Sequence, residues 1–355
     1  MSQPRVYRTE LTPVSFLQRT ACVLPDKPAV LHGSRRYSYR ELEARVHRLA
    51  SALRGAGLAR HDRVAFLCPN IPAMLEAHYG VPLAGGVLVA VNTRLSTDEI
   101  GYILDHSGSR FLFVDAELEA LVKPLGLDGV RVVRVDDTGA AGDPYEDFLA
   151  LGSPEPVPSW LEDEEEILAI NYTSGTTGRP KGVMYTHRGA YLNAIGEIIE
   201  SGMSFDTRYL WTLPMFHCNG WCFTWTMAAS AGTHVCLRRV EAPAIFALMK
   251  EHRVTHYCGA PIVHNQLIGA PEELRRGLDQ RVSAMVAGAA PPTAMIEGME
   301  RIGFDLTHVY GLTETYGPAA VCAKQEEWQG LDVATRAERN GRQGVRYALQ
   351  DGLTV

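Results

Sequence analysis

The sequence has no apolar run of membrane-spanning length, no block of basic residues and no regular cysteine spacing. A transmembrane helix needs about 20 consecutive apolar residues, so none is expected. A formal net charge of −7 without a basic block argues against nucleic acid as a partner. Residues 1–20 lack the succession of basic, apolar and small residues that marks a signal peptide, so we predict that they are not one.

The seven cysteines are odd in number and scattered along the chain. This spacing fits free thiols in a reducing compartment better than a disulfide framework. His217, Cys218 and Cys222 lie close enough in sequence to suggest a metal site, but no second ligand pair lies near them. We therefore predict a cytoplasmic protein with unpaired cysteines.

The chain of 355 residues has room for two or three subdomains. Short runs that are apolar throughout alternate with segments of helical periodicity, which predicts parallel sheets covered on both faces. We predict an α/β fold: two doubly wound αβ subdomains followed by the start of a β-rich, distorted-barrel subdomain. The predicted boundaries are 1–160, 161–320 and 321–355. The acidic run 162–166, near the first boundary, is interpreted as a solvated connector without a catalytic role.

Hydrophobic periodicity also predicts the individual elements. The predicted helices cover 39–58, 71–79, 98–106, 189–200, 221–231, 242–252 and 293–301. The predicted strands cover 64–67, 86–91, 111–114, 130–135, 167–170, 209–213, 235–237, 283–287 and 306–310.

Residues 172–182 are the most informative segment, Tyr-Thr-Ser-Gly-Thr-Thr-Gly-Arg-Pro-Lys-Gly. The segment follows the apolar run 167–170, so a loop rich in hydroxyl and amide donors leaves a buried strand. Such a loop suits the oxygens of a polyphosphate, and Lys181 adds a mobile positive charge. A Walker A loop requires Ser or Thr after its lysine, whereas Gly182 follows Lys181. Composition alone leaves a plain surface loop as the alternative.

Two further glycine-marked positions follow predicted strands. Gly288 and Ala289 come after 283–287, and Tyr310 and Gly311 end 306–310. Ligands of doubly wound sheets collect at the carboxyl ends of the strands. Three such ends that converge on one crevice predict a nucleotide site.

These segments resemble a known group of enzymes. Residues 172–182, together with the run Val-Tyr-Gly-Leu-Thr-Glu-Thr at 309–315, are similar to the two hallmark motifs of the adenylate-forming superfamily. That superfamily includes acyl-CoA synthetases, firefly luciferase and the adenylation domains of peptide synthetases. The run Pro-Met-Phe-His-Cys-Asn-Gly-Trp at 214–221 is most similar to short- and medium-chain fatty acyl-CoA synthetases. The resemblance covers essentially the whole chain and implies an ATP-dependent acid–thiol ligase.

The implied reaction has two steps. A carboxylate attacks the α-phosphorus of ATP to give an acyl-adenylate and pyrophosphate, and the thiol of CoA then displaces AMP. The carboxylate is already ionised near neutral pH, so the first step needs no general base. It needs positioning and neutralisation of phosphate charge, which explains lysine, hydroxyls and a carboxylate in place of a Ser-His-Asp triad.

The resemblance also implies roles for individual residues. The predicted catalytic residues are Lys181, Thr313 and Glu314. Mg²⁺ would be held by Thr173 and Glu314, whose oxygens suit this ion. The residues expected around the nucleotide are Thr173, Ser174, Gly175, Thr176, Thr177, Gly178, Lys181, Gly288, Ala289, His308, Val309, Tyr310, Gly311 and Thr313. Among them, Tyr310 would stack on adenine and Thr313 would bond the α-phosphate. A surface acid that caps a helix is the alternative for Glu314.

The acyl pocket and the CoA tunnel would meet at His217, Cys218 and Trp221, with Trp221 as a gate. A core aromatic is the alternative for Trp221, because an aromatic residue on an apolar segment is usually buried.

The sequence departs from the superfamily in its last part. Members carry a Tyr-x-Thr-Gly-Asp motif that binds ribose and a small C-terminal domain with a catalytic lysine, and neither occurs here. Residues 345–355 are predicted as a strand pair without partners. We therefore predict the large N-terminal portion of a ligase, which binds ATP, turns over poorly and is compatible with a homodimer. The alternatives are a ligase for an aromatic, amino or sulfur-containing acid, or a non-catalytic nucleotide-binding protein.

Overall fold

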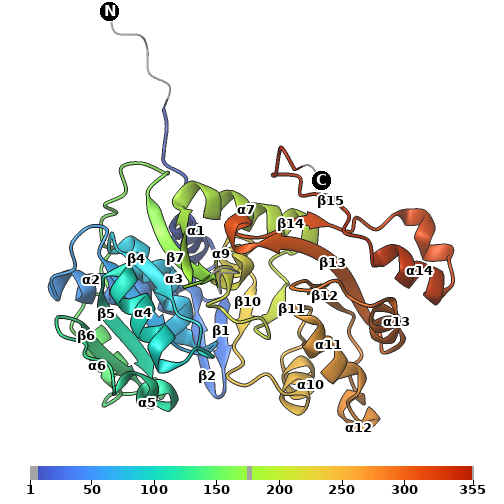
Figure 1. The fold of residues 1–355 in the computed structure, drawn as a ribbon, viewed down its shortest axis with the longest axis horizontal. Helices are drawn as coiled ribbons and strands as arrows, with labels where there is room; N and C mark the ends of the chain where they lie inside the picture. Colours follow the sequence, from blue (N-terminus) through green and yellow to red (C-terminus); the bar gives the residue numbers. More distant parts are fainter. Residues whose placement is uncertain (1–6, 174–177, 354–355) are drawn as a thin grey trace, which may run out of the picture.

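The computed structural model describes residues 7–173 and 178–353. Two sheets, each flanked by helices, form the framework of the protein (Figure 1). Most neighbouring strands are parallel, which confirms the predicted α/β class with two parallel-rich units. Across the described ranges, no helix has both the length and the apolar character that a membrane span requires.

The first sheet has six strands in the order β6-β5-β3-β4-β7-β8. Its strands are β3 (Arg63–Leu67), β4 (Val87–Ala90), β5 (Ser109–Asp115), β6 (Arg131–Val135), β7 (Ile167–Thr173) and β8 (Lys181–Thr186). All neighbours are parallel except β7 and β8, which pair antiparallel as a hairpin. The central strands β3 and β4 are almost wholly buried, as expected for a parallel sheet with helices on both faces.

Some of the helices in this part of the chain begin at a side-chain cap. The helices here are α1 (Val14–Val23), α2 (Tyr39–Gly55), α3 (Pro72–Leu83), α4 (Thr97–Ser107), η1 (Ala116–Leu118), α5 (Glu119–Val122) and α6 (Pro144–Ala150). Ser38 with Glu41, and Ser96 with Glu99, form capping boxes that fix the starts of α2 and α4. Every residue of α3 is buried, which marks it as a core helix.

The second sheet has nine strands in the order β15-β14-β13-β12-β11-β9-β10-β1-β2. Its strands are β1 (Pro28–His32), β2 (Arg35–Ser38), β9 (Arg208–Leu210), β10 (Thr233–Val235), β11 (His256–Gly259), β12 (Val282–Val286), β13 (Phe304–Leu312), β14 (Gly317–Val321) and β15 (Val345–Arg346). The strands from β1 to β13 in this order run parallel, while β2, β14 and β15 pair antiparallel at the two ends.

The remaining helices lie in the second half of the chain (Figure 1). They are α7 (His187–Ser201), α8 (Cys218–Trp221), α9 (Phe223–Ala229), α10 (Ala242–Glu251), α11 (Pro261–Ile268), α12 (Glu272–Arg275), α13 (Thr293–Arg301), η2 (Thr313–Thr315), η3 (Glu326–Gly330) and α14 (Val333–Asn340). The predicted helix 293–301 matches α13, and the predicted helix 242–252 exceeds α10 by one residue.

The second sheet is built from two separate stretches of the chain. The hairpin of β1 and β2 joins the second sheet, although it precedes every strand of the first. The hairpin of β7 and β8 belongs to the first sheet and leads into α7. The subdomain boundaries at 160 and 320 stay predictions. The strands of the first sheet come from one continuous stretch of the chain, and those of the second come from the stretches before and after it.

The predicted helix 221–231 is wrong in its first part. Residues 218–222 all have positive φ, between 50° and 64°, and α9 begins only at Phe223. Four of these five residues are not glycine, and each non-glycine residue in the left-handed region costs about 1–2 kcal/mol. The apolar periodicity of this segment therefore reports its burial and not a right-handed helix.

The acidic run 162–166 is only partly the solvated connector that we predicted. The carboxylate of Glu164 is buried and accepts hydrogen bonds from the backbone N–H of Leu11 (2.9 Å) and from Arg188 (2.6 Å). Glu166 pairs with Arg60. Backbone N–H groups and the arginines lower the pKa of both carboxyl groups, despite the opposing desolvation at Glu166. The run therefore fastens the N-terminal segment and α7 to the first sheet.

The predicted strand pair over 345–355 is also corrected. Within the described residues 345–353, Val345 and Arg346 form the only strand, and β14 is its antiparallel partner. Beyond it, Tyr347 is buried and donates a hydrogen bond to the Glu197 carboxylate of α7 at 3.1 Å.

Candidate functional site

Residues 172–182 form the hairpin between β7 and β8. Thr173, the last residue of β7, lies opposite Lys181, the first residue of β8. Ser174, Gly175, Thr176 and Thr177 lie outside the described residues. Gly178 has a φ of 153°, and the side chain of Lys181 is exposed. The root of the hairpin thus places a hydroxyl and an ammonium group on facing strands.

Helix α4 braces the root of this hairpin. His106 Nδ1 lies 2.9 Å from the Tyr172 hydroxyl, and the Tyr102 hydroxyl donates to the Pro180 carbonyl at 3.3 Å. The guanidinium of Arg179 lies 5.2 Å from the centre of the Tyr102 ring, a cation–π distance. The strands that carry the predicted phosphate loop are therefore held in place from the side.

The second predicted motif lies where β13 ends. Tyr310 is 43% exposed, so its ring is available for stacking. A Cβ atom at Gly311 would lie 1.8 Å from the carbonyl oxygen of Gly317, so only glycine fits this bulge between β13 and β14. The preceding Val309 is buried, and Glu314 is exposed in η2. The backbone therefore presents an aromatic ring and a carboxylate from one turn.

Gly288 and Ala289 follow β12, the strand next to β13. Both are exposed, and a Cβ atom built on Gly288 would meet no heavy atom within 4 Å. Gly288 has a φ of 87°, which favours glycine. His308 is buried, and its Nδ1 lies 2.9 Å from the carbonyl oxygen of Arg342. The imidazole thus contacts the segment after α14.

Thr313 is anchored from two sides. The Tyr185 hydroxyl of β8 donates to the Thr313 carbonyl at 2.6 Å. The Cys218 thiol lies 3.6 Å from Thr313 Oγ1. Burial raises the pKa of the Cys218 thiol, so it stays protonated at neutral pH and is a donor rather than a nucleophile. Both β8 and the left-handed segment 218–222 therefore contact η2.

His217 precedes the left-handed segment 218–222, and Trp221 lies within it. The side chain of His217 is exposed, yet the atoms around it lower its pKa by desolvation, and the positive charge of Arg94 lowers it further. His217 is therefore neutral at pH 7. Trp221 is 4% exposed, and a Cβ atom at Gly317 would lie 3.0 Å from its Cα and Cβ. Trp221 is a buried wall of the core in this structure, and its role as a gate stays a prediction.

Sequence reasoning did not single out two asparagines that connect these parts. Asn171 Nδ2 in β7 donates to Asn219 Oδ1 at 2.6 Å, and the backbone N–H of Asn219 donates to Asn171 Oδ1 at 3.3 Å. Both residues are buried. The available signal was a lone amide in an otherwise apolar strand, because a buried polar side chain requires a partner.

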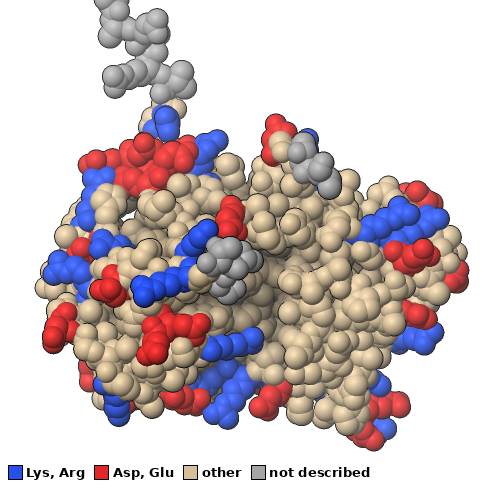
Figure 2. Space-filling view, in the orientation of Figure 1, with Lys and Arg blue, Asp and Glu red and all other residues tan. Residues whose placement is uncertain are grey.

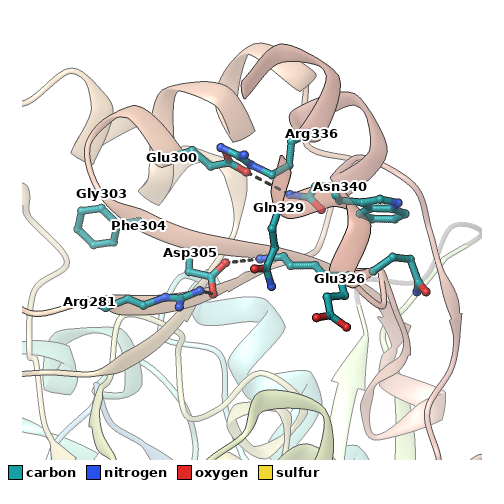
Figure 3. A pocket seen from close by; sticks show the side chains of 12 residues that line it. Arg281, Glu300, Gly303, Phe304, Asp305, Glu326, Gln329, Arg336 and Asn340 are labelled. Carbon is teal, nitrogen blue, oxygen red and sulfur yellow. Dashed lines mark hydrogen bonds and ion pairs between the residues drawn. The ribbon is translucent and has the colours of Figure 1, made fainter. Parts of the chain in front are cut away.

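A large polar cavity of about 750 Å³ lies elsewhere, beside β13, α13 and α14 (Figure 3). Its charged groups neutralise one another: Asp305 pairs with Arg281 and Lys324, and Glu300 pairs with Arg336. None of the predicted nucleotide-binding residues lines it. The cavity therefore offers no surplus positive charge for phosphates.

The surface charge is of mixed sign on the face seen in Figure 2. Figure 2 shows acidic and basic side chains mixed over one face, and the residues drawn in colour form no continuous basic surface there. Within the part of the chain that the structure describes, no group of three or more His, Cys, Asp or Glu side chains could hold a metal ion. The metal site considered for His217, Cys218 and Cys222 is therefore not formed.

Comparison with known proteins defines the family. The AMP-binding enzyme family matches residues 17–349. The chain therefore belongs to this family, and its predicted membership of the adenylate-forming superfamily, close to the acyl-CoA synthetases, is confirmed.

Two CoA ligases and one solved domain structure show the extent of the similarity. The peroxisomal acetate/butyrate–CoA ligase AAE7 of Arabidopsis thaliana is 43% identical, over 98% of this chain and 65% of its own length. The 4-hydroxybutyrate–CoA ligase 2 of Metallosphaera sedula is 41% identical, over 95% of this chain and 63% of its own length. The N-terminal domain of FACL13 from Mycobacterium tuberculosis has a TM-score of 0.82 at 25% identity, over 95% of this chain and 83% of that domain structure. The chain thus spans less than two thirds of the length of these ligases.

Proposed function

We propose that this chain forms the nucleotide- and acid-binding portion of an AMP-forming acyl-CoA synthetase for a short- to medium-chain fatty acid. One observation carries the proposal: the strand β8, which begins at Lys181, contacts the Thr313–Glu314 segment through the hydrogen bond from Tyr185 to the Thr313 carbonyl. Cys218 also contacts Thr313. These contacts support a single site made from the two motifs. The two ligase relatives are named for acetate, butyrate and 4-hydroxybutyrate, which supports a short acyl chain for the substrate.

In the proposed site, each residue acts by position and charge. Lys181 would neutralise the β- and γ-phosphates, and Tyr310 would stack on the adenine. Thr313, whose backbone is fixed by Tyr185, would hold the α-phosphate with its hydroxyl. Such preorganised groups stabilise the charge that develops when the carboxylate attacks, and they lose little by reorganisation. ATP and CoA are the implied co-substrates.

The donor set near the hairpin fits Mg²⁺. The exposed carboxylate of Glu314 and the hydroxyl of Thr173 supply hard oxygen ligands, and phosphate oxygens would complete the shell. When bound, the ion would neutralise phosphate charge. Glu314 and Thr173 would hold it, and Lys181 would add a second positive charge.

The buried Trp221 supports the short chain length. Trp221 is buried and lies so close to Gly317 that a Cβ atom there would be crowded, and we infer that its side chain limits the length of the acyl chain. We expect Trp221→Ala to raise the octanoate-to-butyrate ratio of acyl-adenylate formation at least tenfold. Each methylene that an apolar pocket can accommodate is worth about 1–3 kcal/mol of binding free energy, so space for the additional methylenes of octanoate can produce a change of this size.

The acid preference is measured as single-turnover acyl-adenylate formation with acetate, butyrate, hexanoate and octanoate. Trp160→Ala is the matched control, because Trp160 stacks on Arg54 and lies 37% exposed. An unchanged preference in Trp221→Ala, with the fold intact, would contradict a limiting role for Trp221.

The function itself is tested by binding and exchange. Calorimetry on the purified chain is expected to detect binding of ATP and binding of AMP. The ATP–pyrophosphate exchange reaction is expected to be slow and to depend on a short fatty acid. Benzoate, an amino acid and a sulfur-containing acid complete the panel. Strong stimulation by one of these other acids would change the substrate class, and failure to bind either nucleotide would overturn the proposal. The cytoplasmic location and a homodimer stay predictions.

A further inference from the structure

The segment 218–222 is a left-handed turn that holds five successive residues at positive φ. L-residues enter this region as isolated residues, so a run of this kind persists only where its surroundings dictate it. Gly220 sits directly against the Trp211 ring, where a Cβ atom would lie 2.5 Å from the nearest ring carbon. The turn is therefore pressed into the core by its neighbours.

Polar contacts hold both sides of the turn. On one side, Asn219 exchanges two hydrogen bonds with Asn171, which lies two residues before Thr173 at the root of the hairpin. On the other side, the thiols of Cys218 and Cys222 lie 3.6 Å from Thr313 Oγ1 and 3.5 Å from the Tyr316 carbonyl oxygen. The turn thus connects the last residues of β7 with the segment that contains Glu314.

The asparagine pair contains the shortest of these contacts, at 2.6 Å. Asn219 is fully buried, and its Nδ2 has no hydrogen-bond partner among the described residues. Its Oδ1 and its backbone N–H both bond to Asn171, and its backbone carbonyl accepts a hydrogen bond from the Thr224 hydroxyl. An asparagine held with one unpaired donor in the core is costly, so the contact to β7 has to offset that cost.

We propose that Asn171 and Asn219 form an amide clamp that fixes the phosphate hairpin relative to the Thr313–Glu314 segment. Both are positioning residues, since neither is assigned a contact with the nucleotide. The inference deepens the proposed function and rests on it for the roles of the two segments. The clamp should affect ligands differently. The affinity for a ligand that contacts both the hairpin and the 310–314 turn depends on the clamp, whereas the affinity for a ligand that contacts the 310–314 turn alone does not.

ATP and AMP separate these two cases. The β- and γ-phosphates of ATP reach the hairpin, whereas AMP is bound by the Tyr310 and Thr313 side alone. We expect Asn219→Gly and Asn171→Ala each to weaken ATP binding about tenfold while AMP binding changes less than twofold. Because the two side chains act as one unit, the double variant is expected to bind ATP no more weakly than either single variant.

The variants are chosen so that folding is preserved. Asn219→Gly removes the amide but relieves the positive φ of 52° at this position, since glycine adopts it freely. Asn171→Ala leaves the turn unchanged in sequence. Val46→Ala, a buried substitution in α2, is the control for a general loss of stability, and we expect its ATP-to-AMP affinity ratio to match the wild type.

Calorimetry measures the two affinities, and hydrogen–deuterium exchange of the unliganded protein gives a readout that requires no nucleotide. Faster exchange at both 171–173 and 313–316 in the asparagine variants, together with the selective loss of ATP affinity, is the expected result. An unchanged ATP-to-AMP ratio in folded variants overturns the clamp. If the wild type binds neither nucleotide, the proposed function fails. In that case the clamp is judged by hydrogen–deuterium exchange alone, and unchanged exchange at 171–173 and 313–316 in the variants overturns it.

Discussion

Replacing Glu314 with glutamine is expected to lower ATP–pyrophosphate exchange about 100-fold or more and to abolish the gain in ATP affinity that Mg²⁺ confers. The amide keeps the size of the side chain but removes the negative charge that a hard cation requires. Loss of one preorganised electrostatic group at a reacting centre costs about 10²–10³ in rate. Glu314 is exposed, so the effect should not arise from unfolding.

The measurement is exchange at several Mg²⁺ concentrations, paired with calorimetric titration of ATP with and without the ion. Glu272→Gln in α12 is the matched control, since Glu272 is an exposed glutamate far along the chain from both motifs. If the exchange rate and the ATP affinity of Glu314→Gln depend on Mg²⁺ as they do in the wild type, other residues hold the metal ion.

The second large effect concerns acid stability. Four histidines are buried and kept neutral by desolvation, which lowers the pKa of His78, His187 and His264 to about 4 and that of His234 to about 3. In the unfolded chain the same groups titrate near 6.5. Between these values the unfolded chain binds more protons than the folded protein, so stability falls as the pH is lowered.

The size of this effect follows from linkage. Each histidine contributes about 1.4 kcal/mol per pH unit, so four together contribute about 5–6 kcal/mol per unit below pH 6. Buried Glu197 acts in the opposite direction, because burial raises its pKa, so the net slope is smaller than that of the histidines alone. Small proteins have about 5–15 kcal/mol of total stability. We therefore expect cooperative unfolding within the interval from about pH 6 to about pH 4.

Urea denaturation at pH values between 7.5 and 5 measures this slope. In the variant His264→Gln, the amide can accept from the Tyr257 hydroxyl and donate to the Gly259 carbonyl, which are the two partners of His264. We expect its slope to be smaller by about 1.4 kcal/mol per pH unit. A variant slope equal to that of the wild type would show that His264 is not neutral in the folded protein.

Much of the framework followed from local pattern. The capped helices α2 and α4 and the apolar strands β3 and β5 were predicted within a few residues, because periodicity, caps and burial agree there. The two nucleotide motifs were found for a similar reason: glycine positions and hydroxyl runs are local signals. The comparisons then confirmed the family that these motifs indicated.

What the sequence did not predict depends on contacts between distant residues. The left-handed turn at 218–222 has the apolar composition of a helix, and only packing against Trp211 and Gly317 makes its conformation necessary. The pairing of Asn171 with Asn219 joins positions 48 residues apart. The pairing of β1 with β10, far along the chain, has the same cause, because no local signal tells which sheet a short strand such as β1 will join.

The central claim is that the β7–β8 hairpin and the turn at 310–314 form one nucleotide site. A crystal structure of the chain with a non-hydrolysable ATP analogue tests it most directly. The account predicts the adenine against Tyr310, the α-phosphate near Thr313 and the terminal phosphates at Lys181. An analogue bound with its phosphates away from both Lys181 and Thr313, for example in the polar cavity of Figure 3, would contradict it.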